Sequence, residues 1–283
     1  MTQVVNKKYQ EYDVFIGRPS KWGNPFMIGP HGGREMVIKK YEEWIRTQPH
    51  LMSSIPELRG KRLGCFCHPE ACHGDVLVKL VKEFEMKSAR ERLEAGVKAA
   101  GKCTRCRLSK TRTNVVFGEG SPKADVMFVG EAPGKEEDEQ GRPFVGRSGK
   151  MLNTWIEKGL GLKREDVYIA NTVKCRPNDN RDPAADEMRT CRPFLDKQIE
   201  IVQPKVIVTL GRIAAKSLLG VKDFYITREH GVWKKYNDID LICVYHPAFL
   251  LRQGSKANKK AVQDDFKLIS DKIKSRKVKA DVV

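Results

Sequence analysis

Short apolar runs alternate with helical patterns along the last two-thirds of the chain. The apolar runs fall at residues 125–129, 167–170, 206–210 and 241–245, and the helical patterns between and after them fall at 148–160, 184–202, 213–219 and about 259–274. Runs of four to eight apolar residues that alternate with longer amphipathic segments are typical of a parallel sheet covered by helices. The pattern therefore predicts a three-layer α/β domain, whose ligands we expect beyond the carboxyl ends of the strands.

The first 82 residues have their own, smaller α/β pattern. Residues 12–16 and 62–67 resemble strands, residues 34–47 have the spacing of an amphipathic helix, and a second helix is expected from about His73. Residues 83–100 are charged, rich in Ala and free of Pro, which predicts a helical linker. We therefore expect a small domain at 1–82, a linker at 83–100, and the larger domain with a basic C-terminal tail at 101–283.

Composition and charge narrow the class of protein. No stretch approaches the roughly 18–20 apolar residues of a membrane span, and the N-terminus lacks the apolar core of a signal peptide, so we expect a cytoplasmic protein without a membrane partner. The formal charge is +17, with 36 Lys and Arg against 24 Asp and Glu after residue 100. A polyanionic partner and an ordinary solvated surface both account for such a surplus.

Polar residues follow three of the predicted strands. Glu131 comes after the first strand, Asn171 after the second and His246 after the fourth. Each residue taken alone fits a structural role, as a cap, a turn residue or a buried imidazole. Because parallel strands end at the same edge of a sheet, the three together predict a site that contains an acid, an amide and an imidazole.

The segments around these residues carry a family resemblance. GEAPGKEED from Gly130, GRPFVG from Gly141, NTVKCRP from Asn171 and HPAFLLR from His246 resemble the family 4 uracil-DNA glycosylases, over about residues 101–270. The resemblance implies an enzyme that flips a nucleotide out of DNA, hydrolyses the bond between deoxyribose and uracil, and leaves an abasic site. It also implies DNA containing uracil as the partner, and we expect a monomer.

The resemblance assigns residues to roles. Glu131, Glu137 and His246 are implied to be catalytic, with the two carboxylates near the sugar and the attacking water and the imidazole near uracil O2. Phe144 is implied to stack on uracil, Asn171 to bind its polar edge, and Ala132 to line the substrate site. Leu250, Leu251 and Arg252 are expected to contact DNA, although a helical turn that buries its leucines is the alternative.

Eight cysteines in a chain of this type are more readily explained as ligands or thiols than as disulfides. Cys103, Cys106, Cys175 and Cys191 have a spacing that suits either zinc or an iron–sulfur cluster, and the family resemblance favours a 4Fe-4S cluster with a structural role. Cys243 lies within an apolar run and is expected to be packed in the core.

The first domain resembles a small uncharacterised family through GRPSKWGNPF from Gly17 and CFCHPEACH from Cys65. Cys65, Cys67, Cys72 and His73 suit a zinc site. Alternatively, Cys72 and His73 precede a helix and, with Arg18 and Asn24, would bind a nucleotide or phosphate. A third interpretation is that the thiols are buried and only shape a turn.

Two other functions fit the larger domain. One alternative is a glycosylase that removes another modified pyrimidine by the same chemistry. The other is a non-catalytic protein with the same fold that binds DNA or nucleotides.

Overall fold

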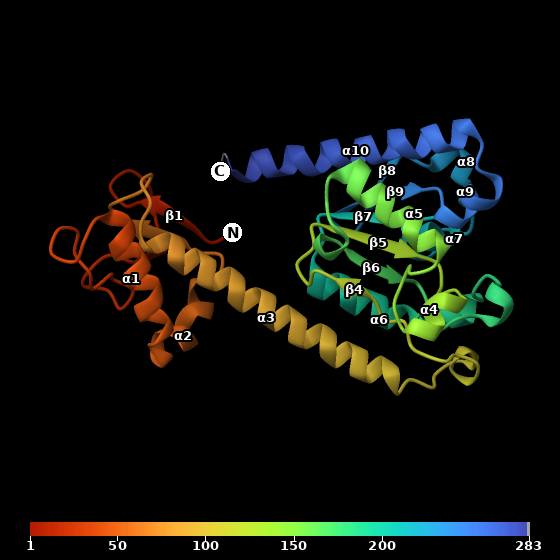
Figure 1. The fold of residues 1–283 in the computed structure, drawn as a ribbon, viewed down its shortest axis with the longest axis horizontal. Helices are drawn as coiled ribbons and strands as arrows, with labels where there is room; N and C mark the ends of the chain where they lie inside the picture. Colours follow the sequence, from red (N-terminus) through yellow and green to blue (C-terminus); the bar gives the residue numbers. More distant parts are fainter. Residues whose placement is uncertain (282–283) are drawn as a thin grey trace. The chain divides into compact units, whose positions relative to one another are not determined.

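The computed structural model describes the backbone of residues 1–281 and the side chains of residues 1–276. The end of the predicted basic C-terminal tail lies outside the described residues. The chain divides into two compact units, Met1–Ser88 and Ala89–Val283, and the long helix α3 contains residues of both (Figure 1).

The first unit is built on a three-stranded parallel sheet with the order β1-β3-β2. Buried side chains of α1 and α3, including Tyr41, Ile45 and Leu77, pack with Leu63 of β3 in one core. Buried Tyr41 also donates a hydrogen bond of 2.8 Å to the carbonyl of Trp22, which fixes the loop after β2. The elements are β1 (Gln3–Asn6), β2 (Val14–Phe15), α1 (Arg34–Arg46), α2 (Pro49–Ser54), η1 (Ile55–Leu58), β3 (Arg62–Cys65) and α3 (His73–Gly101).

The second unit contains a six-stranded sheet with the order β4-β6-β5-β7-β9-β8. The four central strands are parallel, and the edge strands β4 and β8 are antiparallel to their neighbours. The strands are β4 (Glu119–Gly120), β5 (Val126–Gly130), β6 (Tyr168–Asn171), β7 (Val206–Leu210), β8 (Trp233–Tyr236) and β9 (Ile239–Val244). The helices after α3 are η2 (Arg107–Lys110), α4 (Lys135–Gln140), α5 (Arg147–Trp155), the π-helical turn η3 (Ile156–Leu160), η4 (Arg164–Asp166), η5 (Asn178–Asn180), α6 (Ala185–Val202), α7 (Arg212–Leu219), α8 (Ile226–Glu229), α9 (Pro247–Gln253) and α10 (Lys256–Asp281).

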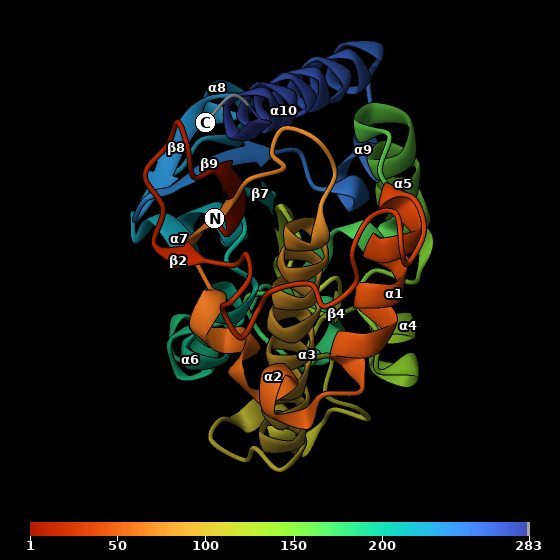
Figure 2. The same cartoon turned by 90° about the vertical axis from the view of Figure 1, so that its left-hand side faces the viewer.

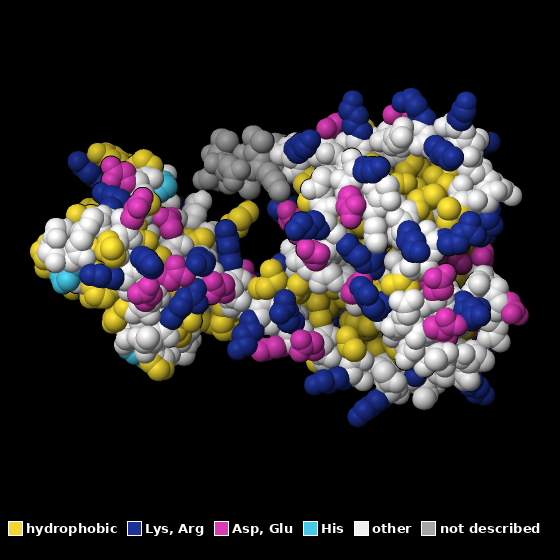
Figure 3. Space-filling model, viewed as in Figure 1, with side chains coloured by type: hydrophobic (Ala, Val, Ile, Leu, Met, Phe, Trp, Pro, Cys, Tyr) yellow, Lys and Arg dark blue, Asp and Glu magenta, His cyan; other side chains and the backbone are white. Residues whose placement is uncertain are grey.

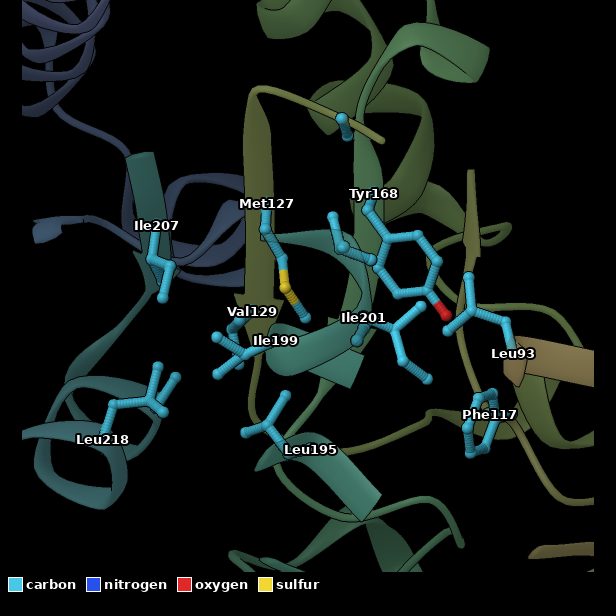
Figure 4. Close-up of a cluster of buried hydrophobic side chains, with 14 of the residues drawn as sticks. Leu93, Phe117, Met127, Val129, Tyr168, Leu195, Ile199, Ile201, Ile207 and Leu218 are labelled. Carbon is cyan, nitrogen blue, oxygen red and sulfur yellow. The ribbon is translucent and has the colours of Figure 1, made fainter. Parts of the chain in front are cut away.

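Helices cover both faces of this sheet, so its central strands are buried and mostly apolar. All residues of β5, β6 and β7 are buried, as expected for parallel strands enclosed on two sides. On one face, Met127, Val129 and Tyr168 pack against Leu195 and Ile199 of α6 (Figure 4). On the other face, α5, α9 and α10 cover the sheet, and α6 and α10 lie on opposite sides of it in Figure 2. The predicted three-layer α/β architecture is confirmed.

The structure differs from the sequence prediction at the proposed linker. Residues 83–100 are part of the continuous helix α3, and Ala89, Leu93 and Ala100 are buried in the core of the second unit. Most of this segment therefore behaves as a packed helix of the larger domain.

Within the described residues, no helix has the length and apolar character needed to cross a membrane.

Candidate functional site

A cavity of about 570 Å³ opens at the carboxyl end of the parallel strands. This volume is in the range of small-molecule sites, roughly 300–1,000 Å³. The segments that follow β5, β6, β7 and β9 all contribute to its lining. Glu131, Phe144, Asn171 and His246, which are far apart in the sequence, line this one cavity.

Asn171 places a polar atom without a partner in the cavity wall. It is the last residue of β6 and is 1% exposed, and its side-chain Oδ1 has no hydrogen-bond partner. A buried carbonyl oxygen without a donor costs about 1–3 kcal/mol, so a ligand that brings an N–H group to this atom gains that energy. Gly130 makes room for this arrangement, because a Cβ there would lie 2.4 Å from Oδ1.

Phe144 is held in an unusual backbone conformation. Its φ is +50°, in the left-handed region, where an aromatic residue is rare and strained. Arg164 fixes this loop, because its guanidinium donates hydrogen bonds to the carbonyl oxygens of Pro143 and Phe144. The resulting ring is 6% exposed and lies 5.9 Å from the ring of His246. A planar base that enters the cavity therefore meets a preformed aromatic wall.

Glu137 connects two loops of the cavity. Its Oε2 accepts a hydrogen bond from the amide of Gly134, and its Oε1 accepts from the amides of Val145 and Gly146, at 2.9–3.2 Å. The loop after β5, which carries Glu131, and the loop that carries Phe144 are thereby joined through one carboxylate. These hydrogen bonds give Glu137 a positioning role between the two loops, and its place near the sugar and the attacking water stays a prediction.

Glu131 is an acid with an altered affinity for protons. Burial, and next the neighbouring carboxylate of Asp182, raise the pKa of Glu131 to about 7, although Arg212 and Arg252 oppose the shift. Asp182 is itself paired with Arg212 at 2.8 Å. Near neutral pH, Glu131 therefore exchanges between a neutral acid and a carboxylate, as a general acid–base group requires.

His246 has a defined tautomer. It caps the N-terminus of α9, and its Nδ1 accepts a hydrogen bond of 3.1 Å from the amide of Ala248. Nδ1 is therefore unprotonated and the ring hydrogen lies on Nε2. Burial, and to a smaller extent Arg252, lower the pKa of His246 to about 4, so the imidazole is neutral at physiological pH and offers an N–H donor.

The other predicted site residues are divided by the structure. Ala132 and Arg252 line the cavity. Leu250 is 6% exposed and packs in the core between the sheet and α10, which favours the alternative of a helical turn that buries its leucine. Leu251, one residue further along α9, is 37% exposed and is accessible to a partner.

Cationic side chains surround the cavity. Lys135, Arg147, Arg181, Arg212 and Arg252 are among its lining residues. Elsewhere, Lys and Arg are spread over the visible face of the second unit rather than gathered in one patch (Figure 3). Two of the cavity cations are already paired, Arg181 with Glu187 and Arg212 with Asp182.

Cys103, Cys106, Cys175 and Cys191 line a second, small cavity of this unit. N–H groups face three of their sulfurs: Arg105 donates to Cys103, Arg112 to Cys175, and the amide of Lys174 to Cys191, at 3.3–3.4 Å. Four thiols that line one cavity are a ligand set for zinc or for an iron–sulfur cluster.

A different group of sulfur and nitrogen ligands lies in the first unit. Cys65, Cys72 and His73 are all buried, and their ligand atoms lie within 4.8 Å of one another. Asn24, predicted as a nucleotide contact, instead accepts from the amide of Phe26 and donates to the carbonyl of Val37. The structure therefore offers a group suited to a metal here, and uses the Asn24 amide for local structure.

Several cavity residues were not identified from the sequence. Asp182, Arg212, Tyr245 and Phe249 line the cavity, and the rings of Tyr245 and Phe249 stack at 5.3 Å. Arg212 lies two residues after the end of β7, and its position near the end of a parallel strand is a signal that the sequence offers. Asp182 lies in a loop far from any strand end, and no sequence pattern marks it.

The fold and the cavity define a three-layer α/β protein with a base-sized site of the kind found in DNA glycosylases. Comparison with known proteins gives the family: the model of the uracil DNA glycosylase superfamily matches residues 117–268, more than half of the chain. The chain therefore belongs to the uracil DNA glycosylase superfamily, and the family predicted from its motifs is confirmed. Residues 2–83 match a domain of unknown function (DUF4326).

Named relatives cover the two regions separately. A type-4 uracil-DNA glycosylase of Sulfurisphaera tokodaii is 49% identical over 176 residues, which are 60% of this chain and 79% of the relative. The type-4 enzyme of Thermotoga maritima is 44% identical over 195 residues, 67% of this chain and 98% of the relative. An uncharacterized 12.4 kDa protein of Enterobacteria phage T4 is 38% identical over 88 residues, 30% of this chain and 81% of the relative.

Proposed function

We propose that this chain hydrolyses the N-glycosidic bond of deoxyuridine in DNA, releasing uracil and leaving an abasic site. The relatives named as uracil-DNA glycosylases support the activity. The structural observation that carries the proposal is the unpartnered Oδ1 of Asn171 in the same cavity as the neutral imidazole of His246. Uracil presents an N3–H donor beside its O2 acceptor, so one base satisfies both groups.

Each residue then has a task set by its chemistry. Phe144 stacks on the extruded base, and Asn171 accepts the N3–H. As the bond to the sugar breaks, negative charge grows on uracil O2, and the Nε2–H of His246 donates to it. A donor placed where charge develops contributes on the order of 3 kcal/mol. We expect Arg252, which lines the cavity, and the exposed Leu251 to grip the DNA next to the extruded nucleotide.

Glu131 acts on the sugar side. As a carboxylate it stabilises the positive charge that develops on the deoxyribose and accepts a proton from the attacking water. Its pKa near 7 allows it to hold that proton. Glu137 supports the reaction indirectly, because its hydrogen bonds hold the loop that carries Phe144 against the loop that carries Glu131.

We further propose that Cys103, Cys106, Cys175 and Cys191 hold a 4Fe-4S cluster. When bound, the cluster would link separate segments of the chain covalently. Its role is structural, because glycosidic hydrolysis transfers no electrons. Lys174 relates this site to the pocket, since its Nζ donates to the carbonyl of Asn171 at 2.7 Å and its amide donates to Cys191.

An oligonucleotide with one deoxyuridine tests the activity, with abasic sites cleaved by alkali. The wild type and the surface control Lys158→Ala should release uracil, whereas Asn171→Ala and His246→Ala should be strongly impaired. Release of another modified pyrimidine but not uracil would favour the second substrate class. Binding without release of any base would favour a non-catalytic protein. Iron analysis and visible absorbance test the cluster, and zinc without iron would overturn it.

A further inference from the structure

The first unit contains a compact group of metal-ligating side chains that uracil excision does not use. Cys65 ends β3, and Cys72 and His73 stand at the start of α3. The three residues are 2%, 3% and 8% exposed, and their ligand atoms all lie within 4.8 Å of one another. No other group of three or more His, Cys, Asp or Glu within the described part of the chain is so compact.

His73 is oriented as a metal ligand. Its Nε2 lies 2.8 Å from the backbone carbonyl oxygen of Ile16. A carbonyl oxygen can only accept, so Nε2 carries the hydrogen and the lone pair of Nδ1 is left free. Histidines that bind metals usually donate their other ring N–H to a carbonyl or carboxylate in this way. The ring also packs edge-on against Tyr41 at 5.1 Å, which further limits its rotation.

The thiol of Cys72 has a matching environment. The amide of Gly74, in the first turn of α3, donates to its Sγ at 3.3 Å. This hydrogen bond holds the sulfur in place, as the outer hydrogen bonds of metal ligands usually do.

Cys67 lies beside this group, outside the three residues whose ligand atoms are all within 4.8 Å of one another. It is half-buried, and its thiol lies close enough to that of Cys65 to interact with it. Asn6 at the end of β1 holds the loop that carries Cys67, because its Nδ2 donates to the carbonyl of His68 at 2.6 Å. Three cysteines and one histidine form one of the usual ligand sets of structural zinc.

We propose that the first unit binds one zinc ion through Cys65, Cys72 and His73 Nδ1, with Cys67 as the fourth ligand. The ion joins the end of β3 to the start of α3 and, through the bond from His73 to Ile16, to the segment after β2. A unit of this size has a small core, so such a link contributes substantially to its stability. This zinc site is independent of the iron-binding cysteines of the second unit.

Metal analysis of the full-length protein, purified without added zinc or chelator, tests the assignment. The wild type should contain one zinc ion per chain in addition to iron. Cys65→Ser and Cys72→Ser should lose the zinc and retain the iron, whereas Cys175→Ser should lose iron and retain zinc. Cys243→Ser is the matched control, because Cys243 is buried in β9 outside both groups, and it should retain both metals.

A second measurement keeps the test independent of the folding of the serine variants. Cobalt exchanged into the wild type should give the intense charge-transfer absorption of cobalt–thiolate bonds, and His73→Ala should lower zinc retention against a chelator. Wild-type protein without stoichiometric zinc would overturn the proposal. So would a Cys65–Cys72 disulfide found by mass spectrometry after alkylation of the freshly purified protein, or zinc that persists in both serine variants. Uracil release measured on the same samples separates a failure of this proposal from a failure of the proposed activity.

Discussion

Gly130→Ala should damage uracil excision much more than folding. A Cβ at position 130 would lie 2.4 Å from Asn171 Oδ1 and 2.5 Å from Cζ of Phe144, whereas ordinary contact begins near 3.4 Å. One or both side chains must therefore move by about 1 Å, and a displacement of that size in an active site costs about 100-fold in rate. The backbone of Gly130 is not in the left-handed region, so the effect is steric.

The assay is single-turnover release of uracil with enzyme in excess, compared with thermal unfolding of the same preparation. We expect the single-turnover rate constant to fall about 100-fold, equivalent to about 2.7 kcal/mol, while overpacking lowers the free energy of unfolding by about 1–3 kcal/mol. Gly101→Ala is the control, because a Cβ there meets nothing within 4 Å. A Gly130→Ala enzyme within about threefold of wild type would refute the claim that Asn171 and Phe144 must hold these positions.

Three further predictions concern charged and titrating groups. Because the pKa of Glu131 is raised to about 7, its carboxylate form is lost as the pH falls through 7, and kcat should fall on the acid side of the pH profile. Asp182→Asn removes the neighbouring negative charge and should move this acid limb of the profile to lower pH. Glu131→Gln should abolish the acid limb and lower kcat about 10²–10⁴-fold. His246 has a pKa of about 4 and should add no inflection to the pH profile of kcat above pH 5. His246→Ala should lower kcat about 10²–10³-fold. His246→Gln keeps an N–H donor, so its kcat should fall less and its pH profile should retain the acid limb that Glu131 produces. The Glu187 side chain is inaccessible to solvent, and Arg181 above all, with the Ala184 amide and Arg107, lowers its pKa to about 2. Its contribution to stability is thus complete above its ordinary pKa of 4.5 and is lost as the pH falls toward 2. Glu187→Gln should lower the free energy of unfolding at pH 7 by about 2 kcal/mol and by much less at pH 3, measured by urea denaturation; equal losses at both values would show that charge is not the cause.

Most of the second unit could be predicted from its sequence because its central strands are buried on both faces. Such strands are continuous apolar runs, and the observed β5, β6, β7 and β9 each fall within two residues of the predicted ones. The edge strand β4 has only two residues and leaves no periodic pattern to detect. Residues 83–100 are helical as predicted, but composition does not show which side of the helix is buried, because a charged, Ala-rich segment has the same composition in a linker and in a packed helix.

The site was predictable where it depends on strand ends. Glu131, Asn171 and His246 each follow a parallel strand, so topology alone brings them to one edge of the sheet. Leu250 and Leu251 could not be told apart, because the rotation of α9 decides which of two neighbouring leucines is buried. Long-range contacts, such as the approach of Asp182 to Glu131, depend on loop paths that no local pattern encodes.

The hydrogen bonds of Lys174 have a consequence for how the protein responds to its chemical environment. Asn171 and Cys175 are four residues apart on one segment, and the buried ammonium group of Lys174 donates to the carbonyl oxygen of Asn171. If Cys175 and Cys191 hold the proposed cluster, an oxidant or an iron shortage that prevents its assembly would free this segment at its far end. Uracil recognition by Asn171 would then weaken although no reagent had entered the cavity.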